Sequence, residues 1–327
     1  MTSSSDSDYL TYDEQALHSS NRLTLHLDTR PGMQLRGRVF GHPDSILSFS
    51  EGLFAKNLGS GEDKFYQMYR KQLHEFLSQD LIPIIYGVVF VNTGKNKNIN
   101  NVNNKNNENN DDDNVISLDF QPSLIVEEGE SRTPMLLEKD IAAGYEKPAM
   151  LDLKLGIRSW RIGASKKKAA RRSAKMQSGS CKFTNFRIRA AMWYSNNENY
   201  PKDEDLTVVS RKFGNECTLE ELKEFFKDFF KCKEILPKMI EKLNSLKKSL
   251  TVLKNDFGVR FYSSSLVVVY DEVNPMKFDL RMLDFEKSYI GIENECEKFN
   301  EPLVNAEDGV IEAVNSVSML LQEVMNC

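Results

Sequence analysis

The chain has 327 residues, of which 40% are apolar and 28% charged, and its formal net charge is −5. This composition excludes a chain that is disordered throughout, and no window approaches the run of about 20 apolar residues that a membrane span needs. We therefore expect a soluble, monomeric protein of the cytoplasm, the nucleus or both. Its five cysteines form no CxxC pair and are predicted to be free thiols.

The first part of the chain is predicted to be rich in strands. Residues 1–20 are rich in Ser and Asp and are expected to form a disordered tail. Residues 62–82 have apolar side chains every three or four positions, which indicates a helix. Residues 92–114 are almost all Asn, Lys, Asp and Glu, so we expect a disordered insertion within a loop. The short apolar runs that we interpret as strands cover residues 23–27, 35–40, 46–54, 84–91, 115–120 and 135–137.

The second part of the chain mixes helices and strands. Thr218 and Glu221 have the spacing of a capping box, and Pro237 is placed to start a further helix. Residues 262–270 and 279–285 are predicted strands, and residues 310–325 a closing helix. The expected fold is α+β, with a small β-rich lobe over residues 21–140, a larger mixed lobe over 141–327, and a cleft between them.

One strand carries two opposite charges on the same face. In the segment from Pro148 to Gly156, leucines alternate with Asp152 and Lys154, so the two charged side chains project to one side. An exposed ion pair of this kind would add little stability. The alternative is a carboxylate that orients a hydroxyl group beside an ammonium that neutralises a phosphoryl group in transfer.

A basic stretch follows this strand. Between Arg158 and Arg189 there are eleven Lys and Arg residues and no acidic residue, which indicates an anionic partner. Helical spacing places Lys167, Arg171 and Lys175 on one face, with Lys168 and Arg172 beside them. The pattern alone leaves nucleic acid, anionic lipid, a nuclear-import receptor and a phosphorylated small molecule open. The absence of aromatic residues among most of these cations argues against single-stranded nucleic acid.

Familiar nucleotide-binding motifs are absent: the chain has no P-loop, no GxGxxG and no HRD sequence. A scattered set of residues remains that could hold phosphates and a metal ion, in the way that kinase-like folds pair a strand Lys with a helix Glu and use a late Asp. These candidates are Lys56, Glu62, Glu138, Asp140 and Asp284.

Together these residues resemble the inositol polyphosphate kinase family, whose signature P-x-x-x-D-x-K-x-G is complete from Pro148 to Gly156. Three further blocks agree in order: Leu136 to Glu138, Arg260 to Leu266 and Arg281 to Phe285. The resemblance implies a two-lobed, kinase-like fold that binds ATP in the cleft between the lobes. It also implies an ATP-dependent phosphotransferase that uses Mg²⁺ and phosphorylates a soluble inositol polyphosphate, with no nucleic-acid partner.

The resemblance also implies roles for individual residues. Asp152 and Lys154 would be catalytic, and Lys154 would also contact the substrate. Asp284 would bind the metal ion, while Ser264 and Ser265 would shape the cleft. ATP would contact Lys56, Glu62, Glu138, Asp140, Ile141 and Asp284, and the substrate phosphates would contact Lys168, Arg171, Arg172 and Lys175.

Within the family, the run from Lys168 to Arg172 is similar to the helix of inositol hexakisphosphate kinases, which implies a diphosphoinositol phosphate as product. An inositol polyphosphate multikinase or an inositol trisphosphate 3-kinase is the alternative. The chain departs from the family pattern at residues 190–192, which read Ala-Ala-Met, and at Glu286 and Lys287, where hexakisphosphate kinases usually have Ala-His. A non-catalytic polyanion-binding module is the competing hypothesis from another class of protein.

Overall fold

A computed structural model of the chain describes residues 22–28, 46–59, 61–91, 115–121, 132–194 and 206–326. The predicted tail, the predicted strand at 35–40 and the Asn-rich insertion lie outside these residues. The described chain forms two compact units, one made of residues up to 58 and 84–144, the other of residues 59–83 and 145–327.

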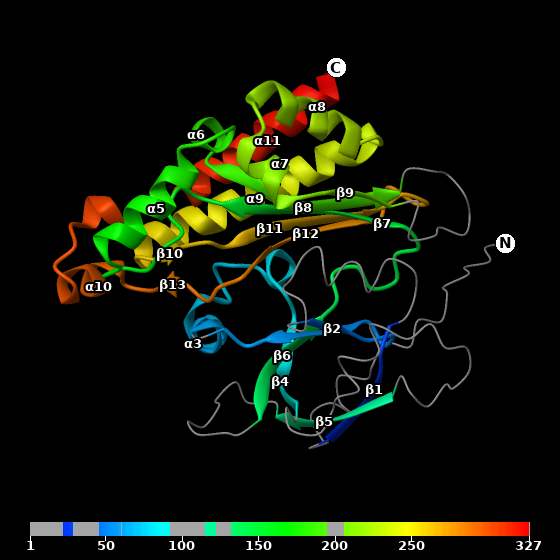
Figure 1. The fold of residues 1–327 in the computed structure, drawn as a ribbon. Coiled ribbons are helices and arrows are strands. Elements are labelled where there is room, and N and C mark those ends of the chain that lie inside the picture. The colour runs from blue at the N-terminus through cyan, green and yellow to red at the C-terminus, as the bar shows by residue number, and fades with distance from the viewer. Residues whose placement is uncertain are drawn as a thin grey trace. The chain divides into compact units, whose positions relative to one another are not determined.

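The first unit is built on one antiparallel sheet, with strand order β1-β5-β4-β6-β3-β2 (Figure 1). Its strands are β1 (Arg22–His26), β2 (Ile46–Ser48), β3 (Leu53–Asn57), β4 (Ile85–Val91), β5 (Val115–Gln121) and β6 (Thr133–Lys139). Alternation puts Leu23 and Leu25 of β1 in a core with Leu53 and Leu137, while the residues between them face outward.

The second unit contains a five-stranded antiparallel sheet in the order β12-β11-β7-β8-β9. The strands are β7 (Pro148–Leu155), β8 (Phe186–Tyr194), β9 (Leu206–Val209), β11 (Ser265–Asp271) and β12 (Phe278–Leu283). The predicted strand at 148–156 is thus the central strand, β7. It is paired on both sides, which is consistent with its nearly complete burial.

Helices α8 (Leu219–Phe229), α9 (Leu236–Asp256) and α11 (Val310–Asn326) gather on one side of this sheet in Figure 1. The predicted capping box is confirmed, because Thr218 accepts from the Glu221 amide and Glu221 accepts from the Thr218 amide. Pro237 lies in the first turn of α9 as expected. The apolar faces of α9 and α11 pack together and form much of the core.

Residues 59–83 belong to the second unit, although the sequence alone places them in the first lobe. They form α3 (Glu62–Met68), a π-helical turn (Tyr69–Leu73) and a 3₁₀ turn, η2 (Gln79–Leu81). Phe65 stacks on Phe285 with ring centroids 4.2 Å apart, and Arg281 donates to the carbonyl of Ile82 at 2.7 Å. These contacts with distant parts of the second unit explain the grouping, which the local sequence does not reveal.

The predicted strand at 262–270 is wrong in its first part. Two short strands, β10 (Arg260–Phe261) and β11, are separated at Ser263, which adopts a left-handed backbone with φ of 69°. Strand β10 pairs instead with β13 (Ser288–Tyr289). The remaining helices are α5 (Lys166–Met176), α6 (Cys181–Thr184), α7 (Arg211–Glu216) and α10 (Ile292–Lys298), with 3₁₀ turns η5 (Lys233–Ile235) and η6 (Leu303–Ala306). Among the described residues, no helix combines the length and apolarity needed to cross a bilayer.

Candidate active site

The central strand β7 places Asp152 and Lys154 between two neighbouring strands. Lys154 lies opposite Ser265 of β11 and Arg187 of β8, and Asp152 lies two residues earlier on the same face. Because both neighbours are hydrogen-bonded to β7, the two charged side chains start from a rigid backbone. This satisfies the geometric requirement for a preorganised site.

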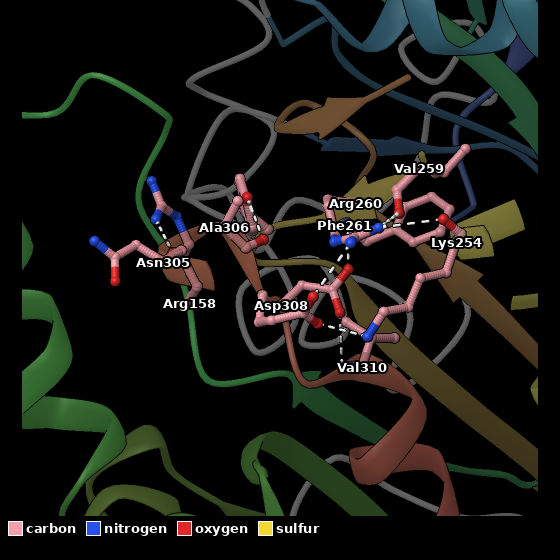
Figure 2. A network of polar contacts seen from close by, with 11 residues as sticks. Arg158, Lys254, Val259, Arg260, Phe261, Asn305, Ala306, Asp308 and Val310 are labelled. Carbon is pink, nitrogen blue, oxygen red and sulfur yellow. Dashed lines mark hydrogen bonds and ion pairs between the residues drawn. The ribbon is translucent and has the colours of Figure 1, made fainter. Parts of the chain in front are cut away.

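The last residue of the motif, Gly156, is required by a loop that crosses directly over it. Its φ is +84°, and a Cβ atom would lie 2.3 Å from the carbonyl oxygen of Asp308. Figure 2 shows how Asp308 holds that loop: its carboxylate accepts from the amides of Phe261 at 2.8 Å and Val310 at 3.0 Å. Burial raises the pKa of Asp308. Because it has no side chain, Gly156 allows the loop that leads into α11 to pack directly on the end of β7.

Lys154, Ser265 and Asp284 form a compact polar triangle. The Lys154 ammonium is 2.8 Å from Asp284 Oδ2 and donates to Ser265 Oγ at 3.2 Å, while Ser265 Oγ donates to Asp284 Oδ2 at 3.4 Å. The Asp284 side chain is 48% exposed and that of Lys154 only 14%. An exposed carboxylate is thus held by an ammonium group that is largely covered by protein.

Asp284 is presented by a strained turn directly after β12. Its φ is +64°, and its carbonyl accepts from Ser264 Oγ at 3.1 Å. The next residue, Phe285, is fully buried, and its amide donates to Glu62 Oε1 at 3.3 Å. A left-handed non-glycine residue persists only where its surroundings fix it. Ser264, Phe285 and Glu62 provide those surroundings.

Asp152 is a buried acid whose pKa is raised. Its side chain is 6% exposed, and Oδ1 has no hydrogen-bond partner among the described residues. Desolvation raises the pKa of Asp152 to about 6; the positive charge of Lys154 opposes this rise, and the negative charge of Asp284 adds to it. A buried carboxylate with an unpartnered oxygen and a pKa near neutrality suits an acceptor of a hydroxyl proton.

The predicted basic helix is α5, and it starts at an N-cap where Ser165 Oγ accepts from the Lys168 amide at 3.3 Å. Lys168, Arg171 and Lys175 are exposed, whereas Arg172 is half-buried near Met176. The positive charge of Arg172 contributes to lowering the pKa of both Arg187 and Lys287. Arg172 therefore interacts electrostatically with other cations of the site.

A cavity of about 580 Å³ is lined by Arg161, Glu286 and Lys287, among others, and the last two follow Asp284 closely in the chain. Glu286 Oε1 is 3.2 Å from Arg161 Nη2, and Glu286 Oε2 is 3.6 Å from Lys287 Nζ. Burial, opposed by Glu286 and reinforced by Lys154, lowers the pKa of Lys287. Glu286 thus places one carboxylate between the cations Arg161 and Lys287.

The remaining predicted ATP contacts lie in the first unit. Lys56 is on β3 opposite Ile46 and Leu136, and Glu138 is on β6 opposite Phe54. Asp140 follows β6 and forms a turn, since its Oδ1 accepts from the Ala142 amide at 2.8 Å and its own amide donates to Gly52 at 2.9 Å. Ile141 lies within this turn and is half-buried.

Three arginines of the second unit also belong to the site's surroundings, although sequence reasoning assigned them no role. Arg187 and Arg189 lie on β8, and Arg211 begins α7. The alternation of Arg187 and Arg189 on a strand was available as a signal within the basic stretch. The position of Arg211 depends on how α7 packs, which no local pattern shows.

The two units and this site define a kinase-like class of fold. The structure resembles that of the inositol phosphate multikinase Ipk2 from S. cerevisiae, solved in complex with ADP and Mn²⁺, with a TM-score of 0.55 and 17% identity over 83% of this chain and 98% of that one. At that identity the similarity establishes the fold alone.

Sequence comparison identifies the family. The family model of inositol polyphosphate kinases matches residues 135–322, and the chain belongs to this family. It is 28% identical over 191 residues to inositol hexakisphosphate kinase 3 of Mus musculus, covering 53% of this chain and 47% of that protein. It is 30% identical over 141 residues to inositol hexakisphosphate kinase 2 of Homo sapiens, covering 42% and 31%. The chain spans about half the length, or less, of these curated relatives.

Proposed function

We propose that this protein transfers the γ-phosphoryl group of ATP to a soluble inositol polyphosphate, with inositol hexakisphosphate as the preferred acceptor and a diphosphoinositol phosphate as product. The observation that carries the proposal is the buried Asp152 with an unpartnered oxygen, next to the Lys154, Ser265 and Asp284 triangle. The curated relatives named inositol hexakisphosphate kinase support the choice of acceptor.

Asp152 has the position and environment to orient the attacking oxygen of the acceptor and to take up a proton from it. Its Oδ1 is available as an acceptor, and the pKa of about 6 leaves the carboxylate mostly ionised at pH 7. In inositol hexakisphosphate the attacking atom is a phosphate oxygen, which is already largely ionised at neutral pH. With this acceptor, Asp152 would contribute to the rate more by orienting the attacking oxygen than by removing a proton.

Asp284 fits the requirements of a Mg²⁺ ligand. It offers a partly exposed carboxylate, and Mg²⁺ in phosphoryl-transfer sites is bound through one or two carboxylates together with substrate phosphates. When bound, Mg²⁺ would neutralise negative charge on the ATP phosphates. Lys154 and Ser265 both donate to Asp284 Oδ2. The Lys154 ammonium group would therefore hold this carboxylate in place and also neutralise charge on the transferred phosphoryl group.

The phosphates of the acceptor would be held by the cations around this triangle. Arg172 of α5 reaches the same region as Arg187 and Lys287, while Lys168, Arg171 and Lys175 extend the positive surface along the exposed side of the helix. Lys56, Glu62, Glu138, Asp140 and Ile141 remain the proposed ATP contacts. Ser264 and Ser265 shape the site through their bonds to Asp284.

The experiment is a product analysis. Purified protein is incubated with ATP, Mg²⁺ and a panel of inositol phosphates, and the products are separated by charge. We expect conversion of inositol hexakisphosphate to a diphosphate, and loss of that product in Lys154→Ala and Asp284→Asn. Phosphorylation confined to less phosphorylated inositols would identify a multikinase or a trisphosphate 3-kinase instead. Salt-sensitive binding of the panel without ATP consumption would identify a non-catalytic polyanion-binding module.

A further inference from the structure

Strand β8 carries Arg187 and Arg189 beside the catalytic strand β7. Arg187 lies opposite Lys154, and the register shifts between Asp152 and Leu153, whose partners are Ala190 and Ile188. Arg189 is therefore the extra residue of a β-bulge. Arg187 shares the face of Lys154 because the two lie directly opposite, and the alternation along β8 puts Arg189 on the same face as Arg187, Lys154 and Asp152.

Helix α7 packs directly on β8 at Gly214. A Cβ atom at Gly214 would lie 1.8 Å from the carbonyl oxygen of Ile188, so only glycine permits this approach. Asn215 of the same helix accepts from Arg187 Nη1 at 2.6 Å and fixes its guanidinium. This packing brings Arg211, the first residue of α7, to the two arginines of β8.

The three arginines interact electrostatically with one another and with the acids of the site. Burial and the positive charge of Arg211 contribute to lowering the pKa of both Arg187 and Arg189. Asp152 acts on both in the opposite direction, and Asp284 acts on Arg189. The acids that interact electrostatically with Arg187 and Arg189 thus include the two carboxylates of the candidate active site. Within the described chain, none of the three guanidinium groups forms an ion pair with a carboxylate.

An anion placed among these three guanidinium groups would relieve their mutual repulsion. Phosphate matches them well, because a guanidinium donates two parallel hydrogen bonds to its oxygens. We propose that Arg187, Arg189 and Arg211, here called the arginine cluster, form a subsite for one phosphate group of the acceptor, on the β8 side of Asp152. This subsite rests on the proposed function, and it lies close to α5, whose Arg172 also acts on Arg187.

The subsite would set the orientation of the inositol ring. With one phosphate on the arginine cluster and others toward Arg172 and Lys287, a polyphosphate would be held at more than one of its phosphate groups. Such clamping restricts which oxygen faces the γ-phosphoryl group. The arginine cluster would therefore contribute to the choice of ring position as well as to affinity.

The test compares Arg189→Gln and Arg211→Gln with Lys212→Gln, a matched control that removes one exposed charge from α7. Binding of inositol hexakisphosphate is measured by calorimetry without ATP, and KM and kcat are measured with it. Each removed guanidinium is expected to weaken binding about tenfold to a hundredfold and to raise KM for the acceptor, with KM for ATP and the melting temperature unchanged. Arg189→Lys should restore only part of the loss, because a lysine cannot bind phosphate with two parallel bonds.

Pentakisphosphates that each lack one phosphate identify the contacted group. The isomer without that phosphate should bind wild-type protein and Arg189→Gln equally well, whereas the other isomers should discriminate between them. The proposal is overturned if both arginine variants bind like Lys212→Gln, or if wild-type protein does not bind inositol hexakisphosphate. Wild-type binding without turnover, weakened by the arginine variants, would support the subsite while refuting the kinase function.

Discussion

Replacing Asp152 by Asn should stabilise the fold at the same time as it abolishes activity. The Asp152 carboxylate is buried, and desolvation raises its pKa from 3.8 to about 6. The folded state therefore binds the proton more tightly than the unfolded state does. Stability is highest when the group is protonated and falls as the pH rises from about 4 to about 6, after which the deficit is constant.

The size of the effect follows from the pKa. A change from 3.8 to about 6, at about 1.4 kcal/mol per unit, means that the ionised Asp152 costs the folded state about 3 kcal/mol at pH 8. At pH 5 the cost is about half as large. Asparagine has nearly the same shape without the charge, so Asp152→Asn should recover about this free energy at each pH.

The assay is urea denaturation at pH 5 and pH 8. Asp228→Asn is the control, because Asp228 is exposed on α8 and its replacement should change the free energy of unfolding by less than about 0.5 kcal/mol at both values. A gain for Asp152→Asn that is larger at pH 8 than at pH 5 supports the account. An equal effect at both pH values, or a loss of stability at pH 8, would refute the reasoning.

Three further predictions follow from the same site. The kcat for phosphoryl transfer should decline below about pH 6 as Asp152 becomes protonated, which a pH–rate profile measures; a flat profile down to pH 5 would exclude its ionised form as essential. Gly156→Ala should destabilise the protein by about 2 to 4 kcal/mol, because its Cβ would lie 2.3 Å from a backbone oxygen at a positive φ; an unchanged melting temperature would contradict this packing. Glu286→Gln should lower KM for the inositol phosphate about threefold to tenfold, since it removes a carboxylate that pairs with Arg161 and Lys287; a higher KM would show that Glu286 assists binding.

The sequence was sufficient wherever local rules decide the structure. The alternation from Met150 to Leu155 predicted that Asp152 and Lys154 share a face of a strand, and the capping box at Thr218 marked a helix start. The basic helix was likewise visible from its composition, within a residue or two of its ends.

Other features depend on contacts between distant segments. Gly214 has no side chain, and this lets α7 pack on β8 and brings Arg211 toward Arg187. The sequence around Gly214 gives no sign of this contact. The break at Ser263 arises where the chain leaves β10 for β11, and its β-branched and aromatic neighbours conceal it. The grouping of α3 with the second unit rests on the stacking of Phe65 and Phe285.

The most direct test of the central claim is transfer of label from ATP to an inositol phosphate. The protein is incubated with Mg²⁺, γ-labelled ATP and inositol hexakisphosphate, and the label is followed by anion-exchange separation. The account predicts label in a diphosphoinositol phosphate with wild-type protein and none with Lys154→Ala. Binding of the polyphosphates without label in any inositol product would contradict it.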